Sequence, residues 1–178
     1  MNRELLEKHM QDLRADRNAL DGVYGMTSRG VYLLARSVLR DAEAAKDVMQ
    51  ETYMRVVANI DKYEPDTNAA AWIMRIARNA AYRRYGEQKR RRAGEVNLDS
   101  LGDSVSDGKD HESVWTDDME LNGAMLRLNP EEREIVTLFA LDGYKHREIA
   151  EILGKPQGTV QWKYNKAIKK LRKFLEEE

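Results

Sequence analysis

Apolar residues recur at intervals of three and four along much of this chain, which is the spacing of one face of an α-helix. Between residues 23 and 40 the recurring positions are Val31, Leu34, Ala35 and Val38. A second stripe, in residues 41–60, consists of Ala45, Val48, Met49, Thr52, Val56 and Ile60. Residues 3–20 have a helical pattern as well, although they are weakly apolar. The pattern therefore predicts three successive helices in this part of the chain.

Short polar signals predict where the helices begin and end. Asp41 is a good N-cap for the helix that carries the second stripe. Residues 61–68 form a predicted loop with one proline, and Thr67 or Asn68 would cap the next helix. In that helix Trp72 and its apolar neighbours recur at helical spacing, so we expect them to face a core rather than DNA. These helices would form a compact N-terminal bundle.

The last fifty or so residues carry a second helical pattern with clear boundaries. Asn129 as cap, Pro130 in the first position and Glu132 at the third form a capping box. A short helix is predicted near residues 146–153, and Gly154 then turns the chain sharply into a long C-terminal helix. Two helices that cross tightly at such a turn are typical of a helix-turn-helix motif.

The long helix has one apolar and one polar face. The apolar stripe consists of Val160, Tyr164, Ala167, Ile168, Leu171 and Leu175. The polar face at its N-terminal end includes Gln157, Gln161, Trp162, Asn165, Lys166 and Lys169. Glutamine and asparagine can pair with adenine edges in the major groove, and lysine can reach guanine or phosphate. The pattern indicates a DNA recognition helix, although a helix-packing unit with a solvated polar face would look similar.

Charge is distributed unevenly along the chain, although the net charge is only −1. Residues 75–92 carry eight Arg or Lys against one acid, whereas residues 95–120 carry nine Asp or Glu against Lys109. The basic block indicates a surface for phosphate, and the acidic block would repel it. Glycine and serine among the acids predict a flexible linker over residues 93–120. Either block, taken alone, would also be compatible with a solvated surface.

Composition excludes several other classes of protein. The chain of 178 residues has no cysteine, which excludes disulfides, zinc fingers and thiol catalysis. It has no apolar run near the ~20 residues that cross a bilayer, and its N-terminus is charged, so neither membrane insertion nor a signal peptide is expected. The three histidines are scattered, and no phosphate-binding glycine loop is present. We therefore expect no enzyme activity, metal, cofactor or small-molecule substrate.

Several segments, in this order, resemble those of a known family. They are residues 47–53 (DVMQETY), 71–79 (AWIMRIARN), 128–133 (LNPEER), 148–154 (EIAEILG) and 158–160 (GTV). Together they resemble the extracytoplasmic-function group of bacterial sigma factors over nearly the whole chain. The resemblance implies an all-α protein with two small helical domains joined by the flexible acidic linker. Sigma domain two would cover residues 1–92, the linker 93–120, and sigma domain four, a helix-turn-helix domain, 121–178.

The resemblance implies a subunit that binds core RNA polymerase and directs promoter-specific transcription initiation. Its polymerase-binding residues would be Asp47, Gln50, Glu51 and Arg55, docked on the clamp helices. The loop 61–68 would take a flipped base of the minus-ten element, with Tyr63 and Asn68 as candidates. The remaining minus-ten contacts would be Arg75, Arg78, Asn79, Tyr82 and Arg83. The minus-thirty-five contacts would be Gln157, Thr159, Gln161, Trp162, Asn165, Lys166 and Lys169.

Further partners and interpretations follow from the resemblance. An anti-sigma factor is an expected partner, and it would hold this bacterial cytoplasmic protein inactive, in some cases at the membrane. The acidic linker would pass through the RNA channel of the polymerase, act only as a tether, or fold over the basic helix and suppress DNA binding. Trp162 departs from the family, and would contact a thymine methyl group, the polymerase or an inhibitor.

The alternative is a stand-alone helix-turn-helix regulator with an N-terminal sensing bundle. Such a regulator would bind duplex DNA tightly by itself, because DNA binders gain much of their affinity from neutralised phosphates. The near-zero net charge and the acidic linker favour the sigma factor instead.

Overall fold

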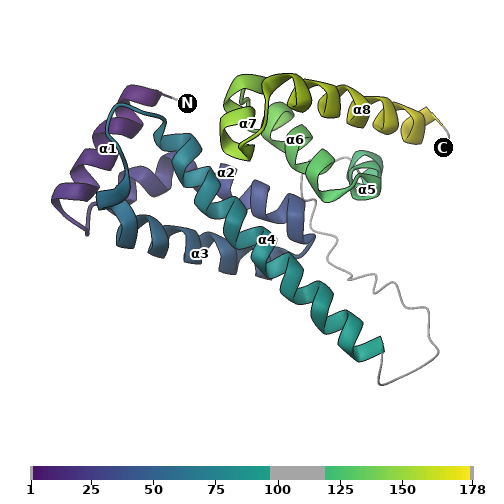
Figure 1. Ribbon diagram of the computed structural model, residues 1–178, viewed down its shortest axis with the longest axis horizontal. Coiled ribbons are helices and arrows are strands. Elements are labelled where there is room, and N and C mark those ends of the chain that lie inside the picture. The colour runs from purple at the N-terminus through teal and green to yellow at the C-terminus, as the bar shows by residue number, and fades with distance from the viewer. Residues whose placement is uncertain (1, 97–118, 177–178) are drawn as a thin grey trace.

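The computed structural model describes residues 2–96 and 119–176, and its regular elements in these ranges are helices (Figure 1). The N-terminal bundle comprises α1 (Arg3–Ala15), α2 (Leu20–Leu39), α3 (Ala42–Asn59), the 3₁₀ turn η1 (Ile60–Lys62) and α4 (Ala69–Val96). The C-terminal domain comprises α5 (Met119–Arg127), α6 (Pro130–Ala140), α7 (His146–Leu153) and α8 (Gln157–Glu176). The predicted all-α fold with two helical domains is confirmed.

The first predicted helix, over residues 3–20, is shorter in the structure, because α1 ends at Ala15 and the second helix already begins at Leu20. The chain breaks at Asp16, whose side chain accepts a hydrogen bond from the backbone N–H of Asn18 at 2.9 Å. This local bond gives the backbone an alternative to the helix, which is how Asp commonly ends one. The helix after it begins at Leu20 and ends at Leu39, and Arg40 adopts a left-handed φ of 61°.

The core of the N-terminal bundle is formed by the stripes that the spacing predicts. Val31, Leu34 and Val38 from α2 meet Ala45, Val48 and Val56 from α3, and all six are at most 1% exposed. Asp41 caps α3 by accepting from Ala44 N–H at 2.9 Å. Asn68, one of the two predicted candidates, caps α4 by accepting from Ala71 N–H at 3.1 Å. From there α4 runs four residues past the predicted end of the bundle, to Val96.

The C-terminal domain begins and turns as predicted. Asn129 and Glu132 form the capping box of α6 around Pro130, and α7 covers the predicted residues. Gly154 takes φ 63°, the left-handed conformation that glycine adopts without a steric penalty, and so permits the sharp turn into α8. One detail of the α8 stripe is wrong: Leu175 is 41% exposed, and Phe174 packs on the small core of α5, α6 and α8 instead.

The two domains share one continuous apolar core in this structure. Ile135 and Leu138 of α6 and Ile149 of α7, all completely buried, belong to the same cluster as the bundle residues Val31 and Ile73. Helix α6 packs on α2, and α7 packs on α4. Helix α3 also packs on α4, on the side opposite to α7 in the view (Figure 1). Four aspartates of the predicted acidic linker, which are Asp99, Asp103, Asp107 and Asp110, lie outside the described residues, and so does the predicted suppression of DNA binding by them.

Candidate polymerase and nucleic-acid interface

The predicted polymerase-binding residues share the solvent-facing side of α3, here called the docking face. Asp47, Gln50 and Arg55 are exposed and Glu51 is half-buried. Their charges are paired with each other and with α4: Arg84 bonds Asp47 at 2.7 Å, Arg55 bonds Glu51 at 2.8 Å, and Arg83 also bonds Glu51. These are exposed ion pairs, which a partner's charges can replace at little cost.

Sequence reasoning missed one residue of the docking face, Met54. Its side chain is 73% exposed, the largest value among the large apolar residues whose exposure the structure describes. An unbranched, polarisable side chain adapts readily to a partner surface, and exposed apolar groups within a polar rim are typical of interface centres. The signal was available in the sequence, because Met54 follows Asp47 by seven residues and therefore lies on the same side of the helix.

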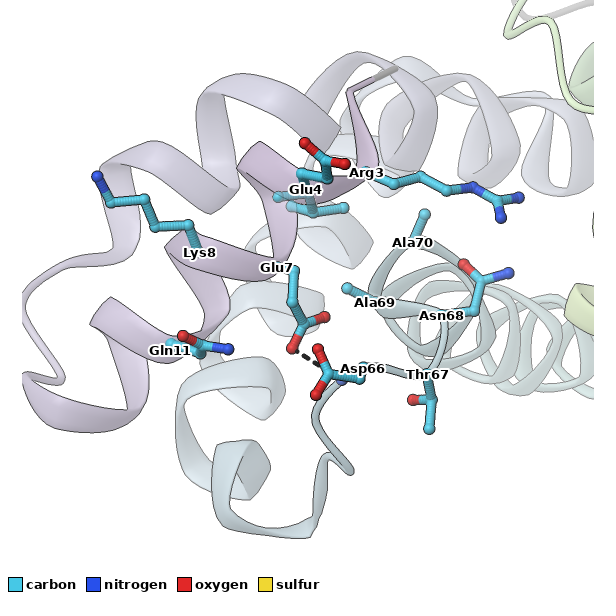
Figure 2. Close-up of a pocket in the computed structure, with 11 residues that line it drawn as sticks. Arg3, Glu4, Glu7, Lys8, Gln11, Asp66, Thr67, Asn68, Ala69 and Ala70 are labelled. Carbon is cyan, nitrogen blue, oxygen red and sulfur yellow. Dashed lines mark hydrogen bonds between the residues drawn. The ribbon is translucent and has the colours of Figure 1, made fainter.

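The loop after η1 borders a pocket of about 380 Å³ against the start of α1. Figure 2 shows Asp66, Thr67 and Asn68 on one side and Glu7 with its α1 neighbours on the other. The backbone N–H of Asp66 donates to Glu7 at 3.1 Å and holds the loop against α1. The lining offers carboxylate, amide and hydroxyl groups, which are suited to hydrogen-bonding the edge of a base.

Tyr63 and Asn68, the two predicted base contacts, lie in different surroundings. Tyr63 is only 3% exposed, its hydroxyl donates to Glu7 at 2.6 Å, and its ring packs on Trp72 with centroids 5.4 Å apart. Burial and the hydrogen bond to Glu7 raise the pKa of Tyr63 to about 12, so it stays a donor. Tyr63 thus holds the loop in place, whereas Asn68 lines the pocket.

The predicted minus-ten residues of α4, here called the α4 face, are only partly accessible. Arg75 and Asn79 are exposed, and Arg83 is paired with α3 as described above. Arg78 and Tyr82 both contact Glu134 of α6: Arg78 Nε lies 2.8 Å from one carboxylate oxygen, and the Tyr82 hydroxyl lies 2.9 Å from the other. The structure therefore brings these two residues together with a carboxylate of the C-terminal domain.

Glu134 is a buried hydrogen-bond acceptor rather than a solvent-exposed acid. Its side chain has no exposed area, and burial raises the pKa of its carboxyl while Arg78 and Tyr82 act against that shift. Burial and the neighbouring Glu134 also raise the pKa of Tyr82, so that hydroxyl stays protonated and donates. The Arg78 guanidinium also lies over the Tyr82 ring, 4.5 Å from its centroid. A buried carboxylate is stable only with such partners.

The predicted minus-thirty-five residues form a separate surface on α8, here called the recognition face. Gln157, Gln161, Trp162, Asn165, Lys166 and Lys169 are exposed, and Thr159 is half-buried. Trp162 is 60% exposed, and the Lys166 ammonium lies 5.1 Å from the centroid of its ring. This face points to solvent at the N-terminal end of α8, where a recognition helix meets base edges.

Neither a membrane segment nor a metal cluster is found in the part of the chain that the structure describes. Within residues 2–96 and 119–176, no helix is long and apolar enough to cross a bilayer. In the same ranges no three His, Asp or Glu side chains gather in a way that would hold a metal ion.

Two family models match parts of this chain. Residues 23–91 match the family described as Sigma-70 region 2, and residues 118–171 match Sigma-70, region 4. The ECF RNA polymerase sigma factor EcfG of Rhodopseudomonas palustris is 31% identical over 141 residues, which cover 79% of this chain and 76% of that protein. The RNA polymerase sigma factor CarQ of Myxococcus xanthus is 31% identical over 150 residues, which cover 81% of each protein.

Two solved structures have a similar fold. One is the sigma factor RpoE in complex with the anti-sigma factor NepR from Bartonella quintana, with a TM-score of 0.66 and 25% identity over 86% of this chain and 94% of that chain. The other is CnrH in complex with the cytosolic domain of CnrY, with a TM-score of 0.70 and 22% identity over 99% of this chain and 98% of that chain.

Proposed function

The chain belongs to the extracytoplasmic-function group of bacterial sigma factors and directs promoter-specific transcription initiation, and we propose how its residues divide this work. The N-terminal bundle binds core RNA polymerase and the melted minus-ten element, and the C-terminal domain binds the minus-thirty-five element. The observation that supports this division is that α3 and α8 present two separate polar faces to solvent.

Core polymerase binds the docking face of α3. Asp47, Gln50, Glu51 and Arg55 supply the polar contacts, and the exposed Met54 supplies an apolar anchor. The polymerase replaces the exposed ion pairs that α3 makes with α4, so that Arg83 becomes available for DNA. The clamp helices of the largest polymerase subunit are the docking partner that the family resemblance implies.

The minus-ten element binds where α4 meets the loop before it. A base flipped from the melted strand enters the pocket beside Asn68. The buried Tyr63 holds the loop 61–68 in position through its hydrogen bond to Glu7. Flipping costs a few kcal/mol, which hydrogen bonds within a polar pocket can offset. Arg75, Arg78, Asn79, Tyr82 and Arg83 hold the phosphates of the same strand and read its edge.

The minus-thirty-five element binds the recognition face of α8 as duplex. Gln157, Gln161 and Asn165 have the amide groups that pair with adenine, and Lys166 and Lys169 reach guanine or phosphate. Thr159 is half-buried near the turn that precedes α8, and it contacts the DNA backbone. Trp162 stands beside Lys166 on this face, where its ring can contact a thymine methyl group.

An anti-sigma factor is the expected regulatory partner of this chain. The RpoE structure to which the chain is similar is a complex with one, NepR. The chain acts in the cytoplasm with RNA polymerase, and the anti-sigma factor holds it inactive there or at the membrane.

Reconstitution with purified core RNA polymerase tests this function. The mixture should start transcription from specific members of a promoter library, and the recovered promoters should share two elements at a fixed spacing. Asp47→Ala together with Gln50→Ala should lower co-elution with core polymerase, and Asn165→Ala should change the minus-thirty-five preference only. No initiation, combined with tight duplex binding by the protein alone, would instead show a stand-alone regulator.

A further inference from the structure

We propose that Glu7 of α1 sets the minus-ten selectivity of this sigma factor by holding the loop 61–68 in the conformation that reads the flipped base. Glu7 acts as a positioning residue, because the loop itself uses both oxygens of its carboxylate. The inference rests on the proposed function, in which the base enters the pocket beside Asn68. Part of the control over promoter choice then lies in α1, which is outside the matched residues 23–91.

The loop is attached to α1 at several points. Just before it begins, Arg14 donates to the backbone carbonyl of Ile60 at 3.1 Å and also to that of Tyr63. Further along, one oxygen of Glu7 accepts from the Tyr63 hydroxyl at 2.6 Å. The other oxygen accepts from the backbone N–H of Asp66 at 3.1 Å, a contact that is drawn in Figure 2. A single side chain of α1 thus fixes two separate points of the loop.

Asp66 has a backbone conformation that needs such support. Its φ is 62°, in the left-handed region that residues other than glycine adopt at a steric cost. Asp66 follows Pro65 in a turn, and where proline precedes a residue of positive φ in a turn, that residue is usually glycine or asparagine. A strained residue persists only where its surroundings hold it, and such residues gather at functional sites. The Glu7 carboxylate supplies one of the contacts that hold Asp66.

The turn at Asp66 determines where Asn68 lies. Only Thr67 separates the two residues, and the Thr67 hydroxyl donates back to the Glu64 carbonyl at 2.7 Å. The side-chain oxygen of Asn68 caps α4, so the amide N–H groups are what Asn68 can offer to a base. In this structure the amide donates to Glu151 at 2.6 Å, which shows that an acceptor from outside the loop can reach it. A shift of the turn would therefore move the donor that we assign to base reading.

Glu7→Gln tests the inference in the initiation assay with core polymerase, on a recovered promoter and on its single-base minus-ten variants. Glutamine has one side-chain oxygen in place of two, so it cannot accept from the Tyr63 hydroxyl and the Asp66 N–H as Glu7 does. Discrimination between bases should fall about tenfold at one minus-ten position. Co-elution with core polymerase and the minus-thirty-five preference should be unchanged, because the docking and recognition faces are elsewhere.

Glu4→Gln is the matched control. Glu4 is also an acid of α1 that lines the pocket. Within the described residues, however, no hydrogen bond joins its side chain to the loop. This substitution removes the same charge from the pocket and should leave the discrimination as it is.

Asp66→Gly separates positioning of the loop from direct reading of the base, because Glu7 also lines the pocket. Glycine adopts a left-handed φ without the steric cost, so the turn then depends less on Glu7. The loss of discrimination caused by Glu7→Gln should be about tenfold in the unsubstituted chain and no more than about threefold in the Asp66→Gly background. An equal loss in both backgrounds would overturn the inference, because it would show that Glu7 contacts the base itself.

The remaining outcomes distinguish this inference from the proposed function. If Glu7→Gln initiates with an unchanged minus-ten preference, the positioning role is wrong and the proposed function stands. If core binding and the minus-thirty-five preference fall together with the minus-ten preference, Glu7 only stabilises the bundle, and the inference is again wrong. If the unsubstituted chain does not initiate with core polymerase, the proposed function fails and this inference fails with it.

Discussion

The polar faces of α4 and α8 carry similar kinds of residue and have different surroundings. Each carries arginine or lysine with an amide and an aromatic residue opposite an apolar stripe, and the same helical spacing predicts both. The recognition face on α8 is open to solvent, whereas Arg78 and Tyr82 on α4 are held by Glu134. Spacing shows which side of a helix avoids the core of its own domain, but it does not show whether another domain covers that side.

We expect the two faces to act in separate steps. An exposed face can bind duplex DNA without a prior conformational change, and the extent of binding depends on the concentrations of protein and DNA and on the salt concentration. In the closed chain, in which the two domains pack together as they do in this structure, Glu134 holds Arg78 and Tyr82, so the apparent affinity of these two residues for DNA is reduced to the extent that the chain is closed. Four predictions test this contrast, beginning with the largest effect.

Arg133→Ala should destabilise the closed chain most. Its guanidinium donates to the carbonyls of Met125, Leu128 and Ser37, and the last of these lies in the other domain. Its loss leaves three carbonyls without that donor, so we expect a loss of about 3–5 kcal/mol in the free energy of unfolding. Urea unfolding followed by tryptophan fluorescence measures this. Arg172→Ala, an exposed arginine on α8, is the control and should change stability little.

Acid should favour the closed chain. Burial raises the pKa of Asp142 from 3.8 to about 6, and Arg29 acts against this shift. A raised pKa means that the closed state prefers the protonated acid, so the stabilisation is complete below pH 3.8 and is lost as pH rises through about 6. The loss should amount to roughly 1–3 kcal/mol of preference for the closed state.

Energy transfer between dyes on the two domains measures this pH dependence. Glu134, whose pKa is also raised by burial, should contribute in the same direction. Asp142→Asn should flatten most of the change between pH 5 and pH 7. A steeper response in Asp142→Asn than in the unsubstituted chain would contradict the assignment.

Much of the fold could be predicted because its signals are local. The caps at Asp41 and Asn129 and the turn at Gly154 are each determined by residues within one or two helical turns, and the structure contains all three. The break at Asp16 was missed because a competing side-chain bond leaves the apolar spacing unchanged. The exposed residues of α3 and α8 were predicted for the same local reason.

The environment of the α4 face could not be predicted, because it depends on contacts between distant parts of the chain. Glu134 and Arg78 are 56 positions apart, and no local pattern pairs them. In the sequence, Glu131, Glu132, Arg133 and Glu134 form a charged run, which ordinarily indicates solvent exposure. Three of these four are buried in the structure, because capping, carbonyl contacts and the domain interface provide their partners.

Asn165→Ala should affect the open face alone. We expect a loss of about 1–3 kcal/mol in discrimination at one minus-thirty-five position, with other positions unchanged. Because α8 is exposed in the closed chain, the loss should be equal in the free protein and in the holoenzyme. Lys169→Ala is the control and should weaken all sequences alike if it contacts phosphate. A loss at Asn165 that appears only in the holoenzyme would show that the recognition face is masked as well.

Met54→Ala should have the smallest effect on the chain itself. The side chain is 73% exposed, so the free energy of unfolding should change by no more than about 0.5 kcal/mol. Binding to core polymerase should still weaken by about 1–2 kcal/mol, because an apolar group at the centre of an interface is desolvated on docking. Leu5→Ala, which removes an apolar side chain that is 42% exposed on α1, should leave core binding unchanged. Because Met54 is exposed while the two domains are packed together, the substitution should leave energy transfer between dyes on the two domains unchanged.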